Sequence, residues 1–229
     1  MTEGLEIGRK EPAREPMFNA PWTVGALVAA LIATHLARIL TGGSPDQFAL
    51  TSTDLAAGRL AGLITYQFVH AGWAHVLMNS AFVLAFGAPV ARYLGGGPRG
   101  AVVFFTFFLV SGAVAAAAYG GMVDAMAMLG HGRVGWALVG ASGAASGLMG
   151  AAARLIQGRG RPGSMVGRVV VGMTFSWIAV NVVLGATGLT PGTAGAPVAW
   201  QAHIFGYLCG LLLIGPSGWL AGADHANAF

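Results

Sequence analysis

A serine and a histidine, each in an apolar and glycine-rich stretch, are the residues of this sequence best suited to chemistry. Ser142 stands in LVGASGAASGLMGAA, and His203 stands in QAHIFGYLCG. A serine hydroxyl beside an imidazole base is the basic arrangement for nucleophilic acyl transfer. A structural role is open for both residues, because a serine can hydrogen-bond its own helix and a buried histidine can be satisfied by a backbone group.

Both stretches carry glycines on one face of the expected helix. Gly206 and Gly210 follow His203 by three and seven residues, so the three share one face of a helix. Gly143 begins a similar face directly after Ser142. Small residues allow membrane helices to approach closely. If the two glycine faces pack together, the serine and the histidine come within hydrogen-bond reach.

A third polar set lies in HAGWAHVLMN, which contains His70, His75 and Asn79. His75 and Asn79 are four residues apart and therefore stack on one helix face. Neutral donors of this kind can stabilise an oxyanion. Two alternatives remain: a structural polar cluster at the start of a helix, and a zinc site built from His70, His75 and His203. Zinc is disfavoured because the HExxH pattern is absent and the only acid between Asp54 and Asp224 is Asp124.

The composition is that of a polytopic membrane protein. Of 229 residues, 55% are hydrophobic and only 9% are charged, against about 25% in soluble domains. The formal charge of +4 does not indicate nucleic acid, since the basic residues lie mostly in short loops between apolar runs. The single cysteine, Cys209, excludes a disulfide within the chain.

The apolar runs predict an all-α membrane protein with six transmembrane helices, since about 20 apolar residues cross a bilayer. Residues 1–20 are expected to form a disordered cytosolic arm, 21–221 the membrane domain and 222–229 a short tail. No internal repeat is present, which disfavours a transporter. The six predicted spans are 21–41, 70–92, 101–122, 136–156, 168–187 and 199–220.

Loop charges predict that both termini are cytoplasmic. With the N-terminus inside, nine Lys and Arg residues fall inside and three fall outside, as the positive-inside rule requires. In that topology Ser142, His203 and His75 all lie toward the outer ends of their spans. The inside set is Arg9, Lys10, Arg14, Arg92, Arg99, Arg154, Arg159, Arg161 and Arg168, and the outside set is Arg38, Arg59 and Arg133.

Taken together and in this order, the motifs over roughly residues 20–220 resemble the rhomboid family of intramembrane serine proteases. The matching motifs are GxSG at Gly140, Ala141, Ser142 and Gly143, AHxxGxxxG at Ala202, His203, Gly206 and Gly210, and HxxxxHxxxN at His70, His75 and Asn79.

The resemblance implies a rhomboid-like six-helix bundle and a Ser–His dyad without an acid. Ser142 would be the nucleophile and His203 the general base, and His75 and Asn79 would stabilise the oxyanion together with the Ser142 amide. Structural support near the site would come from His70, Gly140, Gly143, Gly206 and Gly210.

By the same resemblance, the protein would hydrolyse peptide bonds of transmembrane substrates in the lipid bilayer, with no cofactor or metal. The single cysteine and the short loops favour a bacterial inner membrane, with a mitochondrial membrane as the alternative. The alternatives are a non-catalytic rhomboid-like binder or chaperone of transmembrane segments and, less favoured, a transporter. Nothing in the pattern specifies an oligomeric state.

Three details outside these motifs carry further expectations. Many relatives have an aromatic residue four positions after the nucleophile, where this chain has Ser146, which is expected to contact His203 instead. Arg38 is expected to extend to the membrane interface. The loop 187–200, with two prolines and three glycines, is expected to form a mobile lid over the site.

Overall fold

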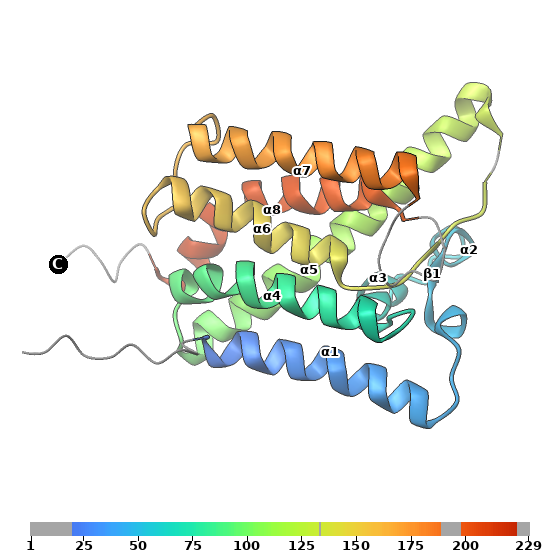
Figure 1. The fold of residues 1–229 in the computed structure, drawn as a ribbon, viewed down its shortest axis with the longest axis horizontal. Helices are drawn as coiled ribbons and strands as arrows, with labels where there is room; N and C mark the ends of the chain where they lie inside the picture. Colours follow the sequence, from blue (N-terminus) through green and yellow to red (C-terminus); the bar gives the residue numbers. More distant parts are fainter. Residues whose placement is uncertain (1–19, 133, 189–197, 224–229) are drawn as a thin grey trace, which may run out of the picture.

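The computed structural model describes residues 20–132, 134–188 and 198–223 and is a bundle of helices (Figure 1). Each predicted span overlaps one long helix, and α5 extends beyond its span at both ends. These helices are α1 (Trp22–Leu40), α4 (Trp73–Leu94), α5 (Pro98–Met126), α6 (Ser142–Gln157), α7 (Arg168–Thr187) and α8 (Trp200–Ala221). In Figure 1, α1 begins and α8 ends at the same end of the bundle. The expected arm, the tail after 223 and most of the expected lid lie outside the described residues.

Five helices of the described part are long and apolar enough to cross a membrane. The exception is α6, which has 16 residues and starts at Ser142, six residues later than the span predicted from 136. The chain before it is not helical, because residues 137–138 form a strand and Gly140 has a φ of +109°. The span predicted from 70 likewise begins as a helix only at Trp73. The count of six spans therefore stays a prediction.

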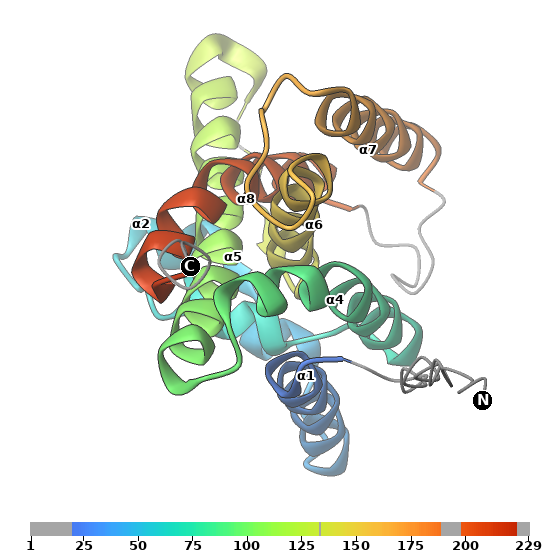
Figure 2. The same ribbon diagram turned by 90° about the vertical axis from the view of Figure 1, so that its left-hand side faces the viewer.

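Helix α6 occupies the middle of the bundle, with α4, α7 and α8 around it (Figure 2). Its sequence explains this position, since it is rich in glycine, alanine and serine, whose small side chains let neighbouring backbones come close. Helix α7 lies on the outside, and Val170 and Asn181 are the only residues that it buries. The residues on which the site depends thus lie at the centre of the fold. Helix α7, the least buried long helix of the described structure, lies beside them.

The glycine faces of α6 and α8 pack against each other, backbone to backbone. A Cβ atom added to Gly206 would collide with the carbonyl oxygen of Gly143, and one added to Gly210 would collide with that of Gly147. No side chain larger than hydrogen fits at these two positions without moving a helix. The close approach of α6 and α8 therefore depends on glycine on the α8 side.

The segment between α1 and α4 supports the chain that leads into α6. It contains a 3-10 turn (Pro45–Phe48), β1 (Leu50–Thr51), α2 (Ser52–Ala56), α3 (Gly62–Thr65) and a second 3-10 turn (Tyr66–Phe68). Strand β1 pairs antiparallel with β2 (Ala137–Leu138), and the amide of Gly140 donates to the carbonyl of Tyr66 at 3.0 Å. The first loop of the bundle thereby holds Ala137, Leu138 and Gly140, which come just before Ser142.

Arg38, which is expected to extend to the membrane interface, hydrogen-bonds the segment that follows α1. Its guanidinium donates to the carbonyl oxygens of Gly43 at 2.7 Å and of His70 at 3.0 Å. These carbonyls belong to the segment between α1 and α4 and have no helical partner there. Arg38 therefore ties that segment to the end of α1 through charge-assisted hydrogen bonds, which are stronger than bonds between neutral groups. Whether its side chain lies at the membrane interface stays a prediction.

Candidate active site

Ser142 and His203 lie within hydrogen-bond distance although 61 residues separate them. The Ser142 Oγ is 2.8 Å from the Nε2 of His203. Ser142 is the first residue of α6, and His203 lies in the first turn of α8. Because the glycine faces of these two helices pack together, the two side chains lie next to each other at the same level of the bundle. The hydroxyl can donate its proton to the Nε2 lone pair, which is the geometry of a serine nucleophile with its base.

The second ring nitrogen of His203 contacts a residue that the sequence analysis did not single out. The Nδ1 of His203 is 2.7 Å from the Oδ1 of Asn181, which comes from α7 and is fully buried. The signal was present in the sequence, since Asn181 interrupts the apolar run 168–187 and a polar residue within a membrane span is costly. It was missed because it belongs to none of the three motifs.

A small cavity of about 120 Å³ opens beside the Ser142 hydroxyl, between α4 and α7. Asn79, Asn181 and His203 line it together with Ser142. Its apolar walls include Phe82 of α4 and Trp177 of α7, whose ring centroids are 5.7 Å apart. The cavity is thus a mostly apolar space lined by a few polar groups, which is the kind of lining that binding sites have, and it is smaller than the usual small-molecule pocket of about 300–1,000 Å³.

Asn79 lies at this cavity, whereas His75 stands behind it. The Asn79 side chain lines the cavity and donates from its Nδ2 to the carbonyl oxygen of His75 at 3.0 Å. The His75 ring packs against Gly140, so that a Cβ added to that glycine would lie 2.8 Å from Nε2. The Nδ1 of His75 accepts a long hydrogen bond of 3.4 Å from the Ala71 amide, which leaves the proton on Nε2.

His70 supports the segment before Ser142 and does not line the cavity. Its Nε2 lies 3.4 Å from the amide of Ala141, and its ring centroid is 5.1 Å from that of His75. Burial and the nearby His75 hold the pKa of His70 down at about 3. The imidazole is therefore neutral at physiological pH, and its Nε2 can accept from the Ala141 amide.

Ser146 was expected to contact His203, but its hydroxyl makes no hydrogen bond to that histidine in the described structure. Its hydroxyl donates to the carbonyl oxygen of Ser142 at 2.7 Å, one turn back along α6. A serine within a helix often bonds in this way, which directs the side chain along its own helix. The aromatic ring near His203 is instead that of Trp177 from α7, at a centroid distance of 6.1 Å and a tilt of 35°.

The described residues do not support the zinc alternative. No group of three or more His, Cys, Asp or Glu side chains in this part of the chain lies within reach of one metal ion. His70 and His75 lie together, whereas His203 is engaged by Ser142 and Asn181.

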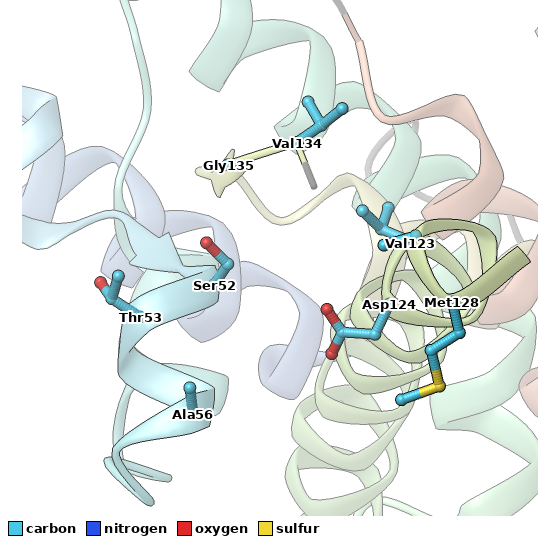
Figure 3. Close-up of a pocket in the computed structure, with 9 residues that line it drawn as sticks. Ser52, Thr53, Ala56, Val123, Asp124, Met128, Val134 and Gly135 are labelled. Atoms are coloured by element: carbon cyan, nitrogen blue, oxygen red, sulfur yellow. The ribbon is translucent and has the colours of Figure 1, made fainter. Parts of the chain in front are cut away.

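A wider cavity of about 640 Å³ lies outside this site, between α2 and the far end of α5 (Figure 3). Asp124 points toward the gap, and Ser52 and Thr53 stand across it. The cavity contains none of the predicted site residues.

Comparison with known proteins supports a family assignment. A family model described as Rhomboid domain matches residues 57–220, which is most of the chain and includes all the candidate site residues. No curated protein matches the chain.

Proposed function

The chain belongs to the rhomboid family, and from this premise we propose that it is an intramembrane serine endopeptidase that cleaves membrane-spanning protein substrates. The family generally consists of such proteases, and the chain is an integral membrane protein. The observation that carries the proposal is the 2.8 Å contact between the Ser142 Oγ and the His203 Nε2 beside a cavity. A serine needed only for helix packing requires neither an imidazole partner nor an adjoining space.

In the proposed reaction the Ser142 oxygen attacks the carbonyl carbon of the scissile peptide bond while its proton passes to the Nε2 of His203. The resulting imidazolium then donates this proton to the leaving amine as the C–N bond breaks. Water hydrolyses the acyl-enzyme, again with His203 as the base. Each step requires the Nε2 of His203 to face Ser142, and the two atoms lie 2.8 Å apart.

The groups proposed to stabilise the oxyanion surround the start of α6. The Ser142 amide is at the first position of the helix, where an N–H group has no acceptor within the helix and the helix dipole favours negative charge. Asn79 can supply an amide donor from the cavity wall, and the Nε2–H of His75 lies behind Gly140. Such preorganised donors are worth several kcal/mol in a site from which water is largely excluded.

The position of the cavity suggests how a substrate reaches Ser142. The cavity lies between α4 and α7, and α7 is the least buried of the long helices in the described structure. We place the substrate segment against these two helices, with its scissile bond at the Ser142 end. We also place the opposite end of the bundle in the bacterial cytoplasm, because the arginines of the short loops lie there. They are Arg92, Arg99, Arg154, Arg159, Arg161 and Arg168.

The proposal is tested by reconstituting the purified protein in liposomes with a single-span test substrate that has small residues near one end of its span. The expected result is two product peptides whose masses locate the cut within or next to the span. Stable association with the intact substrate and no product would contradict the proposal. That outcome would favour the non-catalytic binder.

Asn79→Ala is expected to lower kcat by about 100- to 1,000-fold, the usual effect of removing one oxyanion donor. The matched control is Ser80→Ala, which removes the next side chain of α4, a buried hydroxyl that has no hydrogen-bond partner among the described residues. It should retain activity within a few fold. Rates on the reconstituted test substrate measure both effects, and thermal unfolding checks that each variant is folded. A loss below tenfold for Asn79→Ala would shift the oxyanion role to His75.

A further inference from the structure

Asn181 makes a contact with His203 that the proposed Ser–His mechanism does not use. Its Oδ1 lies 2.7 Å from the Nδ1 of His203, and its side chain is fully buried. Its amide nitrogen donates to the carbonyl oxygen of Trp177 at 2.9 Å. Both ends of the side-chain amide are therefore engaged.

These two contacts determine which way the amide faces. A carbonyl oxygen can only accept, so the NH₂ group of Asn181 must be the end that faces Trp177. The oxygen of the amide is then the end that faces His203. Since this oxygen can only accept, the Nδ1 of His203 must carry a proton and donate it.

The protonation of Nδ1 determines the state of the other ring nitrogen. A neutral imidazole carries one proton, so a proton on Nδ1 leaves Nε2 with a lone pair. That lone pair faces the Ser142 hydroxyl at 2.8 Å. The opposite tautomer would place a proton between His203 and Ser142, where a base is needed, and would leave two acceptors facing each other at Nδ1.

We propose that Asn181 is the positioning residue of the site, which holds His203 in the tautomer able to accept the proton of Ser142. The three side chains form a hydrogen-bonded Ser–His–Asn chain across α6, α8 and α7. This proposal rests on the proposed function. Asn181 acts through the imidazole and has no contact of its own with the reacting atoms. Removing the acceptor should therefore slow the chemical step and leave substrate binding nearly unchanged.

The variant that removes the acceptor is Asn181→Leu, which has a similar volume and no polar atom. We expect kcat on the reconstituted test substrate to fall by about 10- to 100-fold, with KM within about twofold of wild type. Asn181→Asp keeps an oxygen acceptor at the same place and should recover most of the rate. An equal loss in both variants, or a change confined to KM, would overturn the positioning role.

Thr174→Val is the matched control for the docking of α7 on α8. The Thr174 hydroxyl lies 3.0 Å from the hydroxyl of Tyr207, so this variant also removes a polar contact between these two helices, two turns from Asn181. It should keep kcat within about twofold. A loss as large as that of Asn181→Leu would mean that any loosening of α7 impairs the enzyme, and would contradict a specific role for Asn181.

The tautomer can be read directly, without activity, from nitrogen NMR of ¹⁵N-histidine-labelled protein in detergent. The six histidines of the chain give few signals, and His203→Gln identifies those of His203. We expect a protonated Nδ1 and an unprotonated Nε2 in wild type, and a mixture of tautomers in Asn181→Leu. A proton on Nε2 in wild type would overturn the proposal, whether or not the protein cleaves substrates. The expected tautomer in a protein that cleaves nothing would leave the positioning role intact and refute the protease.

Discussion

Ser142→Ala is expected to reduce cleavage of a reconstituted membrane-spanning substrate to the level of liposomes without protein. His203→Ala should have the same effect, since the hydroxyl is a weak nucleophile without its base. In a soluble serine protease the loss of either residue costs roughly 10⁶-fold in kcat, and the loss of both costs no more. The double variant Ser142→Ala/His203→Ala should therefore be no worse than either single variant.

The control for this prediction is Ser217→Ala, which removes a buried serine near the C-terminal end of α8, far along the helix from His203. It should cleave at close to the wild-type rate. Product formation by Ser142→Ala, or single losses that multiply in the double variant, would show that the two side chains do not act as one unit.

Gly210→Ala is expected to lower activity by about 100-fold and to reduce the thermal midpoint by several degrees. The added methyl group would collide with the carbonyl oxygen of Gly147, so that α6 and α8 must move apart. Overpacking of this kind costs about 1–3 kcal/mol, and a misplacement of about 1 Å at a catalytic site costs about 100-fold in rate. Cleavage rates and thermal unfolding of the purified variant measure the two effects.

Gly215→Ala is the matched control on the same helix. A Cβ atom there would lie 3.9 Å from the nearest atom, the Nη1 of Arg154, which is an ordinary contact. This variant should behave like wild type in both measurements. A similar loss in Gly215→Ala would point to a general effect of alanine in α8, and full activity of Gly210→Ala would show that the close approach of the helices is not required.

The sequence patterns predicted the helices and their packing partners well. The positions of Gly206 and Gly210 relative to His203, with Gly143 after Ser142, indicated two glycine faces able to pack together, and in the structure the two helices meet there. The family resemblance is likewise supported by the match over residues 57–220. Both predictions rest on local spacing, which the sequence contains directly.

The features that the sequence did not predict depend on contacts between distant segments. The start of α6 at Ser142 follows from the pairing of β1 with β2 and from the bond between Gly140 and Tyr66. Arg38 donates to carbonyl oxygens of the loop between α1 and α4. The sequence around Arg38 does not show where that loop runs. The contact of Asn181 with His203 requires α7 to lie beside α8, which the sequence does not show, although Asn181 is a polar residue in an apolar run.

The most direct test of the account is whether Ser142 is an activated nucleophile. The purified protein would be treated with a serine-directed fluorophosphonate probe, and the modified residue identified by mass spectrometry beside the Ser142→Ala and His203→Ala variants. We expect one adduct on Ser142, absent from both variants. A folded wild-type protein without this adduct, or with equal labelling of Ser142 in His203→Ala, would contradict it and leave the serine as a packing residue between α6 and its neighbours.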